Sequence, residues 1–127
     1  MVVKTDAAWN GTTRSAGLGW TTKKQEVSLQ FKEAARLVNS PLTAEGLAMQ
    51  SSVKKCMELD VQHIIFQSDS SQLIKALNSL VEPPEIYGII ADIRIICSAV
   101  VALEVMLLSL LAGELLMMAK IVGYDST

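Results

Sequence analysis

The spacing of apolar residues changes from a strand-like repeat to a helical repeat about one third of the way along the chain. "MVVKTDAAW" alternates with a period of two, and "AGLGWTT" and "VSLQFKEA" follow as two more strand-like segments. The residues "NGTTRS", which favour turns, separate the first two segments. Three successive strands of this kind predict an antiparallel meander.

A helix is predicted next, because "SPLTAEGLAMQSSVKKCMEL" has apolar residues at helical spacing. Ser40 followed by Pro41 is typical of a helix start, with a capping hydroxyl and then proline at the first helical position. Glu45 opens a stripe that continues through Met49 and Val53. The carboxylate of Glu45 is therefore expected on the inward face of this helix.

One more strand and two more helices follow. "HIIFQSD" predicts a buried strand, "SSQLIKALNSL" a helix capped by Ser70 or Ser71, and "VEPPE" a loop. "IYGIIADIRIICSA" predicts a helix with an inward face made of Ile86, Ile89, Ile90, Ile93 and Cys97. The order of three strands, helix, strand and two helices indicates an α/β protein.

Composition places the chain among globular proteins. Half of its 127 residues are apolar and 19% are charged, which is enough for one domain over residues 1–127 and excludes a disordered chain. The first residues lack the long apolar region of a secretory signal, so we expect an intracellular protein. Cys56 and Cys97 are then expected to be reduced core thiols.

The charge is divided unevenly along the chain. The formal net charge is −2, but residues 1–55 carry +4 and residues 56–127 carry −6. The overall charge gives no indication of nucleic-acid binding. The basic half is consistent with phosphate contact and equally with an ordinary solvated surface.

The segment from Ala99 to Ala119 is the most apolar part of the chain. Glu104 and Glu114 are its only charged residues, and its length would suffice to cross a bilayer. Each glutamate would cost roughly 2–3 kcal/mol in the bilayer, so we favour a strand followed by a helix over a membrane span. A segment that does not pack natively is the third alternative, and its apolar surface could then drive self-association.

Three carboxylates share a pattern. Asp6 lies in the first strand, Glu45 near the start of the first helix and Asp69 at the end of the fourth strand, each on a part of its element expected to face the core. Carboxylates that converge without a cationic partner repel one another, and Mg²⁺ or Mn²⁺ would relieve that repulsion. The alternative for Asp69 is that it only caps the following helix.

Four motifs in the order "KTDAAWN", "AGLGW", "SPLTAEGLAM" and "IIFQSDSSQLIKALNS" resemble the plant ribonuclease H-like domain associated with non-LTR retroelement reverse transcriptases. The resemblance runs from about Val3 to Cys97. It implies a ribonuclease H-like α/β fold, a five-stranded mixed sheet flanked by helices. It also implies that Asp6, Glu45 and Asp69 are metal ligands and that two Mg²⁺ ions support cleavage of the RNA strand of an RNA–DNA hybrid.

The chain departs from this family near its end. The family motif Asn-x-x-Ala-Asp-x-Leu-Ala-Lys aligns with Ala112 to Lys120, which puts Leu116 where the family has a fourth carboxylate. The family's mobile histidine is also missing, because His63 is expected to begin the fourth strand. A frame shift over Glu114 to Met118 would explain the departure, and the genomic DNA decides that hypothesis.

Two functions remain open at this point. The first is a hybrid-specific ribonuclease with a site of three carboxylates, weakened by loss of the fourth. The second is a non-catalytic or vestigial nucleic-acid-binding module with the same fold. Neither requires a small-molecule cofactor, and in both we expect RNA–DNA hybrid or another nucleic acid as the partner, read by groove shape, 2′-hydroxyls and phosphates.

Overall fold

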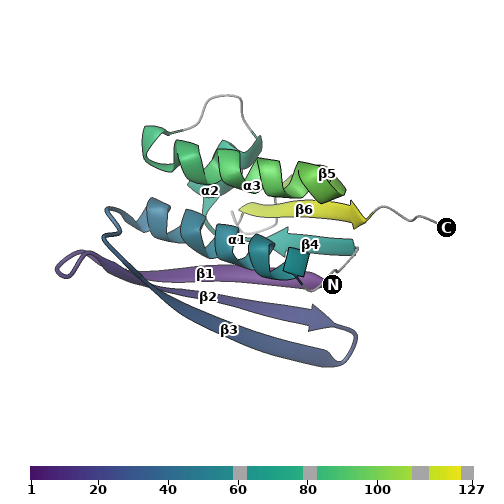
Figure 1. Cartoon of the computed structure of the whole chain (residues 1–127), viewed down its shortest axis with the longest axis horizontal. Coiled ribbons are helices and arrows are strands. Elements are labelled where there is room, and N and C mark those ends of the chain that lie inside the picture. Colours follow the sequence, from purple (N-terminus) through teal and green to yellow (C-terminus); the bar gives the residue numbers. More distant parts are fainter. Residues whose placement is uncertain (59–62, 79–82, 110–114, 124–127) are drawn as a thin grey trace.

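The computed structural model of the chain describes the backbone of residues 1–58, 63–78, 83–109 and 115–123, and the side chains of residues 1–58, 64–78 and 83–96 (Figure 1). Its elements are, in order, β1 Val2–Asn10, β2 Ser15–Lys24, β3 Val27–Arg36, α1 Pro41–Glu58, β4 His63–Gln67, α2 Ser71–Asn78, a 3₁₀ turn Pro84–Ile86, α3 Tyr87–Val100, β5 Val101–Ser109 and β6 Leu115–Gly123. The elements up to α3 agree with the predicted order.

The strands form a mixed sheet in the order β3-β2-β1-β4-β6-β5. The pairs β1–β2 and β2–β3 are antiparallel, so the predicted meander is confirmed. The pair β1–β4 is parallel and extends only from Val2–Ile65 to Lys4–Gln67. Beyond Lys4, the edge of β1 that faces β4 is therefore unpaired, and the carboxylates of Asp6, Glu45 and Asp69 meet at this opening.

The helices share one core with one face of the sheet. Side chains from β1, β2 and β4, such as Val3, Trp20 and Phe66, pack with buried residues of all three helices. The inward face predicted for this helix is confirmed for Ile90 and Ile93 of α3 and for Ile86, which is buried in the preceding 3₁₀ turn, with Ile89 partly buried. The Cys97 side chain lies outside the described residues. The opposite face of β1–β3 is left uncovered by these helices.

The start of α1 is fixed as predicted. Ser40 caps it, because the Ser40 hydroxyl accepts the amide of Thr43 at 3.1 Å, and Pro41 is its first residue. A second, smaller core cluster that includes Leu18 and Ala44 holds this end of α1 against β2. Glu45 therefore directly follows a well-anchored first turn.

The chain before α1 is tied to the first hairpin. The indole nitrogen of Trp9 donates to the carbonyl of Val38 at 2.8 Å, and the Val38 amide donates to the carbonyl of Arg14 at the same distance. These bonds satisfy the backbone amide and carbonyl of Val38, the one buried residue between Leu37 and Ser40. They also fix the position of α1 relative to β1.

The structure of the C-terminal part differs from the predicted strand followed by a helix. After β5, a helix was expected, but Leu115–Gly123 is a strand, β6, so the sheet has six strands rather than five. The residues of β6 include good helix formers, yet β4 offers an unpaired edge, and β6 fills it antiparallel from His63–Val122 to Phe66–Ala119. Hydrogen bonding to that edge outweighs the small differences in helix propensity.

The other predictions for the C-terminal half have mixed outcomes. No helix within the described ranges combines the length and apolar character needed to cross a bilayer. The side chains through which residues 99–119 were predicted to self-associate lie outside the described set. Cys56 is buried in the core, as expected.

Candidate metal centre

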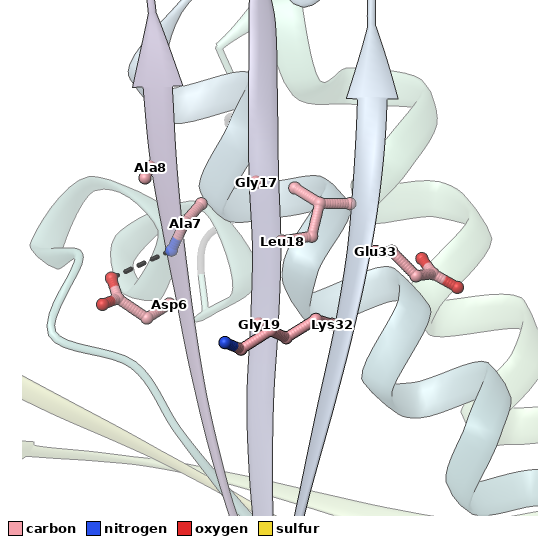
Figure 2. A pocket seen from close by; sticks show the side chains of 8 residues that line it. All are labelled: Asp6, Ala7, Ala8, Gly17, Leu18, Gly19, Lys32 and Glu33. Atoms are coloured by element: carbon pink, nitrogen blue, oxygen red, sulfur yellow. Dashed lines mark hydrogen bonds between the residues drawn. The ribbon is translucent and has the colours of Figure 1, made fainter.

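Asp6 and Asp69 reach the same level of the sheet because β1 and β4 are parallel. Lys4 and Gln67 form the last described pair between these strands, and Asp6 and Asp69 each lie two residues beyond it. Asp6 Oδ1 accepts the backbone amide of Ala7 at 2.9 Å, which helps to hold its carboxylate at the open edge of β1 (Figure 2). The parallel register thus brings together two acids 63 positions apart in the chain.

Asp69 is not the cap of α2. The Ser70 hydroxyl accepts the Leu73 amide at 3.3 Å, and the Ser70 carbonyl accepts the Ile74 amide at 3.1 Å. The amide of Ser70 is in turn bonded to the Ser68 hydroxyl. The capping position is therefore Ser70, as one of the two predicted alternatives had it, and the Asp69 carboxylate is left for another role.

Glu45 supplies the third carboxylate from the second turn of α1. Its neighbour Gly46 lets α1 approach α3 closely, because a Cβ at that position would lie 3.3 Å from Cγ2 of Ile89. Glu45 Oε2 is buried and has no hydrogen-bond partner among the described residues. A buried oxygen of this kind costs free energy unless something binds it.

The three side chains converge. Asp6, Glu45 and Asp69 each present a carboxylate oxygen within 4.8 Å of the others. Burial, followed by the negative charges of Asp6 and Asp69, raises the pKa of Glu45 from 4.5 to about 7, against the lowering effect of the Ala7 backbone. This arrangement is the acidic triad, and its clustered hard oxygens and unsatisfied buried atom fit Mg²⁺ or Mn²⁺.

The predicted orientation of the aspartates was wrong. Asp6 and Asp69 are exposed, and only Glu45 is half-buried. Val3 and Thr5 occupy the buried face of β1, so the alternation of side chains turns Asp6 toward the open face. Asp69 lies in the bend between β4 and α2, where its side chain is exposed between the buried Ser68 and the partly buried Ser70. Solvent reduces the repulsion among the three carboxylates. The group that a bound cation would stabilise most is Glu45, because its buried oxygen has no partner among the described residues.

Sequence reasoning missed a hollow beside the triad. On the open face of the sheet, a shallow cavity of about 310 Å³ is lined by residues that include Asp6, Gly17, Gly19 and Lys32 (Figure 2). Glycine inside a strand often marks close approach of a ligand or another backbone. The "AGLGW" motif, with glycines two apart on one strand face, was therefore the available signal.

Comparison with solved structures shows a ribonuclease H-like fold. The N-terminal RNase H domain of a Mycobacterium tuberculosis protein, solved as a fusion with maltose-binding protein, is 18% identical, with a TM-score of 0.65 over 76% of this chain and 73% of that chain. RNase H1 from the halophilic archaeon Halobacterium salinarum is 16% identical, with a TM-score of 0.66 over 75% and 74%. At these identities the likeness establishes the fold alone.

A third solved structure has the same fold, and a family comparison identifies the family of the chain. LC11-RNase H1, isolated from compost by a metagenomic approach, is 19% identical, with a TM-score of 0.61 over 77% of this chain and 75% of that chain. No curated protein sequence matches the chain. Residues 4–109, which contain all three carboxylates, match the family described as reverse transcriptase-like. With most of its length matched, the chain belongs to the reverse transcriptase-like family.

Proposed function

We propose that the chain is a single ribonuclease H-like domain that hydrolyses the RNA strand of an RNA–DNA hybrid, of the kind associated with plant non-LTR retroelement reverse transcriptases. The observation that carries the proposal is the acidic triad, with oxygens of Asp6, Glu45 and Asp69 within 4.8 Å on a ribonuclease H-like fold. The RNase H1 names of two structural neighbours support the choice of substrate.

In this proposal Asp6, Glu45 and Asp69 would each contribute a carboxylate ligand to divalent cations. When bound, such ions supply activation of the attacking water and neutralisation of charge on the leaving oxygen. The chain itself orients the carboxylates: Ala7 holds Asp6 through its amide, and Ser70 keeps α2 capped without using Asp69. Glu45 must lose its proton before it can act as a ligand.

Several basic residues are candidates for phosphate contacts outside the triad. Lys23 and Lys24 are exposed at the end of β2. Arg14 lies in the turn between β1 and β2, where its guanidinium also donates to the side chain of Asn39. Contacts of this type position a duplex without reading its sequence.

A second candidate function is a nucleic-acid-binding module that no longer cleaves. The observation in its favour is β6, since a strand occupies Leu115–Gly123, where the family resemblance implies a helix with the fourth carboxylate. Fewer ligands would weaken binding of the second ion. We therefore expect activity well below that of a four-carboxylate relative, with Mn²⁺ supporting more cleavage than Mg²⁺.

A labelled RNA–DNA hybrid distinguishes the two functions. The wild-type chain, Asp69→Asn and the control Asp92→Asn are incubated with hybrid in Mg²⁺, in Mn²⁺ and in EDTA. Asp92 is a suitable control because it lies on α3, where it pairs with Lys54 at 3.3 Å, and it takes no part in the triad. Metal-dependent cleavage that is lost only in Asp69→Asn supports the nuclease. Equal background in all three, with salt-sensitive hybrid binding, supports the binding module.

A further inference from the structure

The open face of β1–β3 carries a groove that begins beside the acidic triad. Two adjoining hollows, of about 310 and 230 Å³, share the lining residues Asp6, Gly19 and Lys32. We call their combined surface the glycine groove. Its position on the face opposite the helices leaves it accessible to a large ligand such as a nucleic-acid strand.

Lys32 lies in one row with Asp6 across three strands. Asp6 is opposite Gly19 in the β1–β2 pair, and Gly19 is opposite Lys32 in the β2–β3 pair. Residues directly opposite one another project from the same face of a sheet. Because Gly19 has no side chain, nothing on β2 separates Lys32 from β1. Figure 2 shows the Lys32 side chain lying across Gly19 toward β1.

The Lys32 ammonium does not neutralise the acidic triad. The Asp6 carboxylate points to the other side of β1 in Figure 2, where it accepts the Ala7 amide. Within the part of the chain whose side chains are described, Lys32 has no ion-pair or hydrogen-bond partner. The Lys32 side chain thus lines the same hollows as Asp6 while its charge stays available for an external anion.

Gly19 is not required by the backbone of β2. Its φ is not in the left-handed region, and an added Cβ would approach only the carbonyl oxygens of Phe31 and Asp6, at 3.8 and 3.9 Å. Those are ordinary contacts, so a larger residue would fit the strand itself. What a side chain at position 19 would remove is the open path of Lys32 across the sheet.

We propose that Lys32, reaching across Gly19, binds the phosphate adjacent to the one held at the acidic triad, on the same nucleic-acid strand. Lys32 is therefore a positioning residue, and this inference rests on the proposed function. A lysine ammonium is a compact point charge suited to phosphate. Every nucleotide carries a negative charge that the triad alone would repel, so a cation one phosphate away offsets that repulsion and sets the register of the strand.

A binding assay tests this role without metal or cleavage. Fluorescence anisotropy measures the binding of a labelled RNA–DNA hybrid in EDTA at a series of salt concentrations. Lys32→Met keeps the length of the side chain and removes its charge. We expect it to weaken binding about tenfold, the loss of one hydrogen bond to a charged group, and to lower the salt slope by about one. Lys75→Met removes the same charge from an exposed position on α2, outside the groove, and should leave the slope unchanged.

A double-mutant cycle tests the path across Gly19. In a Gly19→Val background, the loss caused by Lys32→Met should disappear, because the valine already blocks the lysine. Gly17→Val is the matched control: it adds the same volume to the same face of β2, where a Cβ would have no neighbour within 4 Å, but it lies in the row of Ala8 and Ala34. There the loss caused by Lys32→Met should persist.

The outcomes separate this inference from the proposed function. In one outcome, the wild-type chain binds hybrid while Lys32→Met and Lys75→Met weaken that binding equally. That result overturns the role of Lys32 and leaves the proposed function standing. A wild-type chain that binds no hybrid in EDTA overturns the role of Lys32, and the cleavage assay in Mn²⁺ then decides the proposed function. Circular dichroism confirms folding of each variant, and Lys32→Gln replaces Lys32→Met if the latter does not fold.

Discussion

At Glu45, burial and two neighbouring aspartates act in the same direction on one carboxylate and raise its pKa to about 7. Between pH 4.5 and 7, the folded metal-free chain keeps a proton on Glu45 that the unfolded chain has lost. The contribution of Glu45 to the free energy of unfolding is therefore largest below pH 4.5 and is lost as the pH rises through 7.

Glu45→Gln should remove this pH dependence. In EDTA at pH 8, we expect the variant to be more stable than the wild-type chain, whereas near pH 4.5 the two should be nearly equal. Urea unfolding midpoints at pH 5, 6, 7 and 8 measure the difference, with Glu26→Gln, in the exposed turn after β2, as the control. A stability difference that does not change with pH would contradict the assigned environment of Glu45.

Among the elements, α2 shows how a helix start can leave a carboxylate unused. The Ser70 hydroxyl accepts the free amide of Leu73 in the first turn of the helix, so Ser70→Ala should destabilise the chain by about 1 kcal/mol. Ser71→Ala, one residue further on, removes a hydroxyl that makes no capping bond among the described residues. It should change the stability of the chain little. Thermal unfolding of both variants gives the comparison. Equal losses would mean that Ser70 is not the cap.

The contact between α1 and α3 depends on a glycine. Replacing an interior helical glycine by alanine gains about 1 kcal/mol where the new methyl group has room. Gly88, near the start of α3, has nothing within 4 Å of an added Cβ, so Gly88→Ala should be stabilising by that amount. Gly46→Ala should gain less or nothing, because its methyl group would lie 3.3 Å from Ile89. Equal gains in urea unfolding would refute the close helix contact.

The limits of sequence-based prediction also become clear at the level of elements. The meander and α1 were predictable because alternation, Ser40–Pro41 and the helical stripe all indicate local structure. The convergence of the triad was expected from the family resemblance. The exposure of Asp6 follows from the alternation of side chains in β1, and the prediction that Asp6 faces the core was wrong. The strand β6 was not predictable from local propensity, because it forms by pairing with β4, an element about fifty residues earlier in the chain.

For the whole molecule, a divalent cation should act as a stabilising ligand. A cation that binds only the folded chain raises the free energy of unfolding by about 2.7 kcal/mol at one hundred times its dissociation constant. We therefore expect Mn²⁺ at pH 8 to raise the unfolding temperature of the wild-type chain. The shift should be much smaller in Asp69→Asn. An equal shift in both would mean that the metal binds elsewhere.

The oxygen of Glu45 that no described group satisfies has an evolutionary consequence. In a copy of this gene no longer selected to bind a cation at the acidic triad, a neutral replacement among the three acids would relieve their repulsion and raise the stability of the fold. Random drift would therefore be expected to erase the trio early, well before the hydrophobic interior decays.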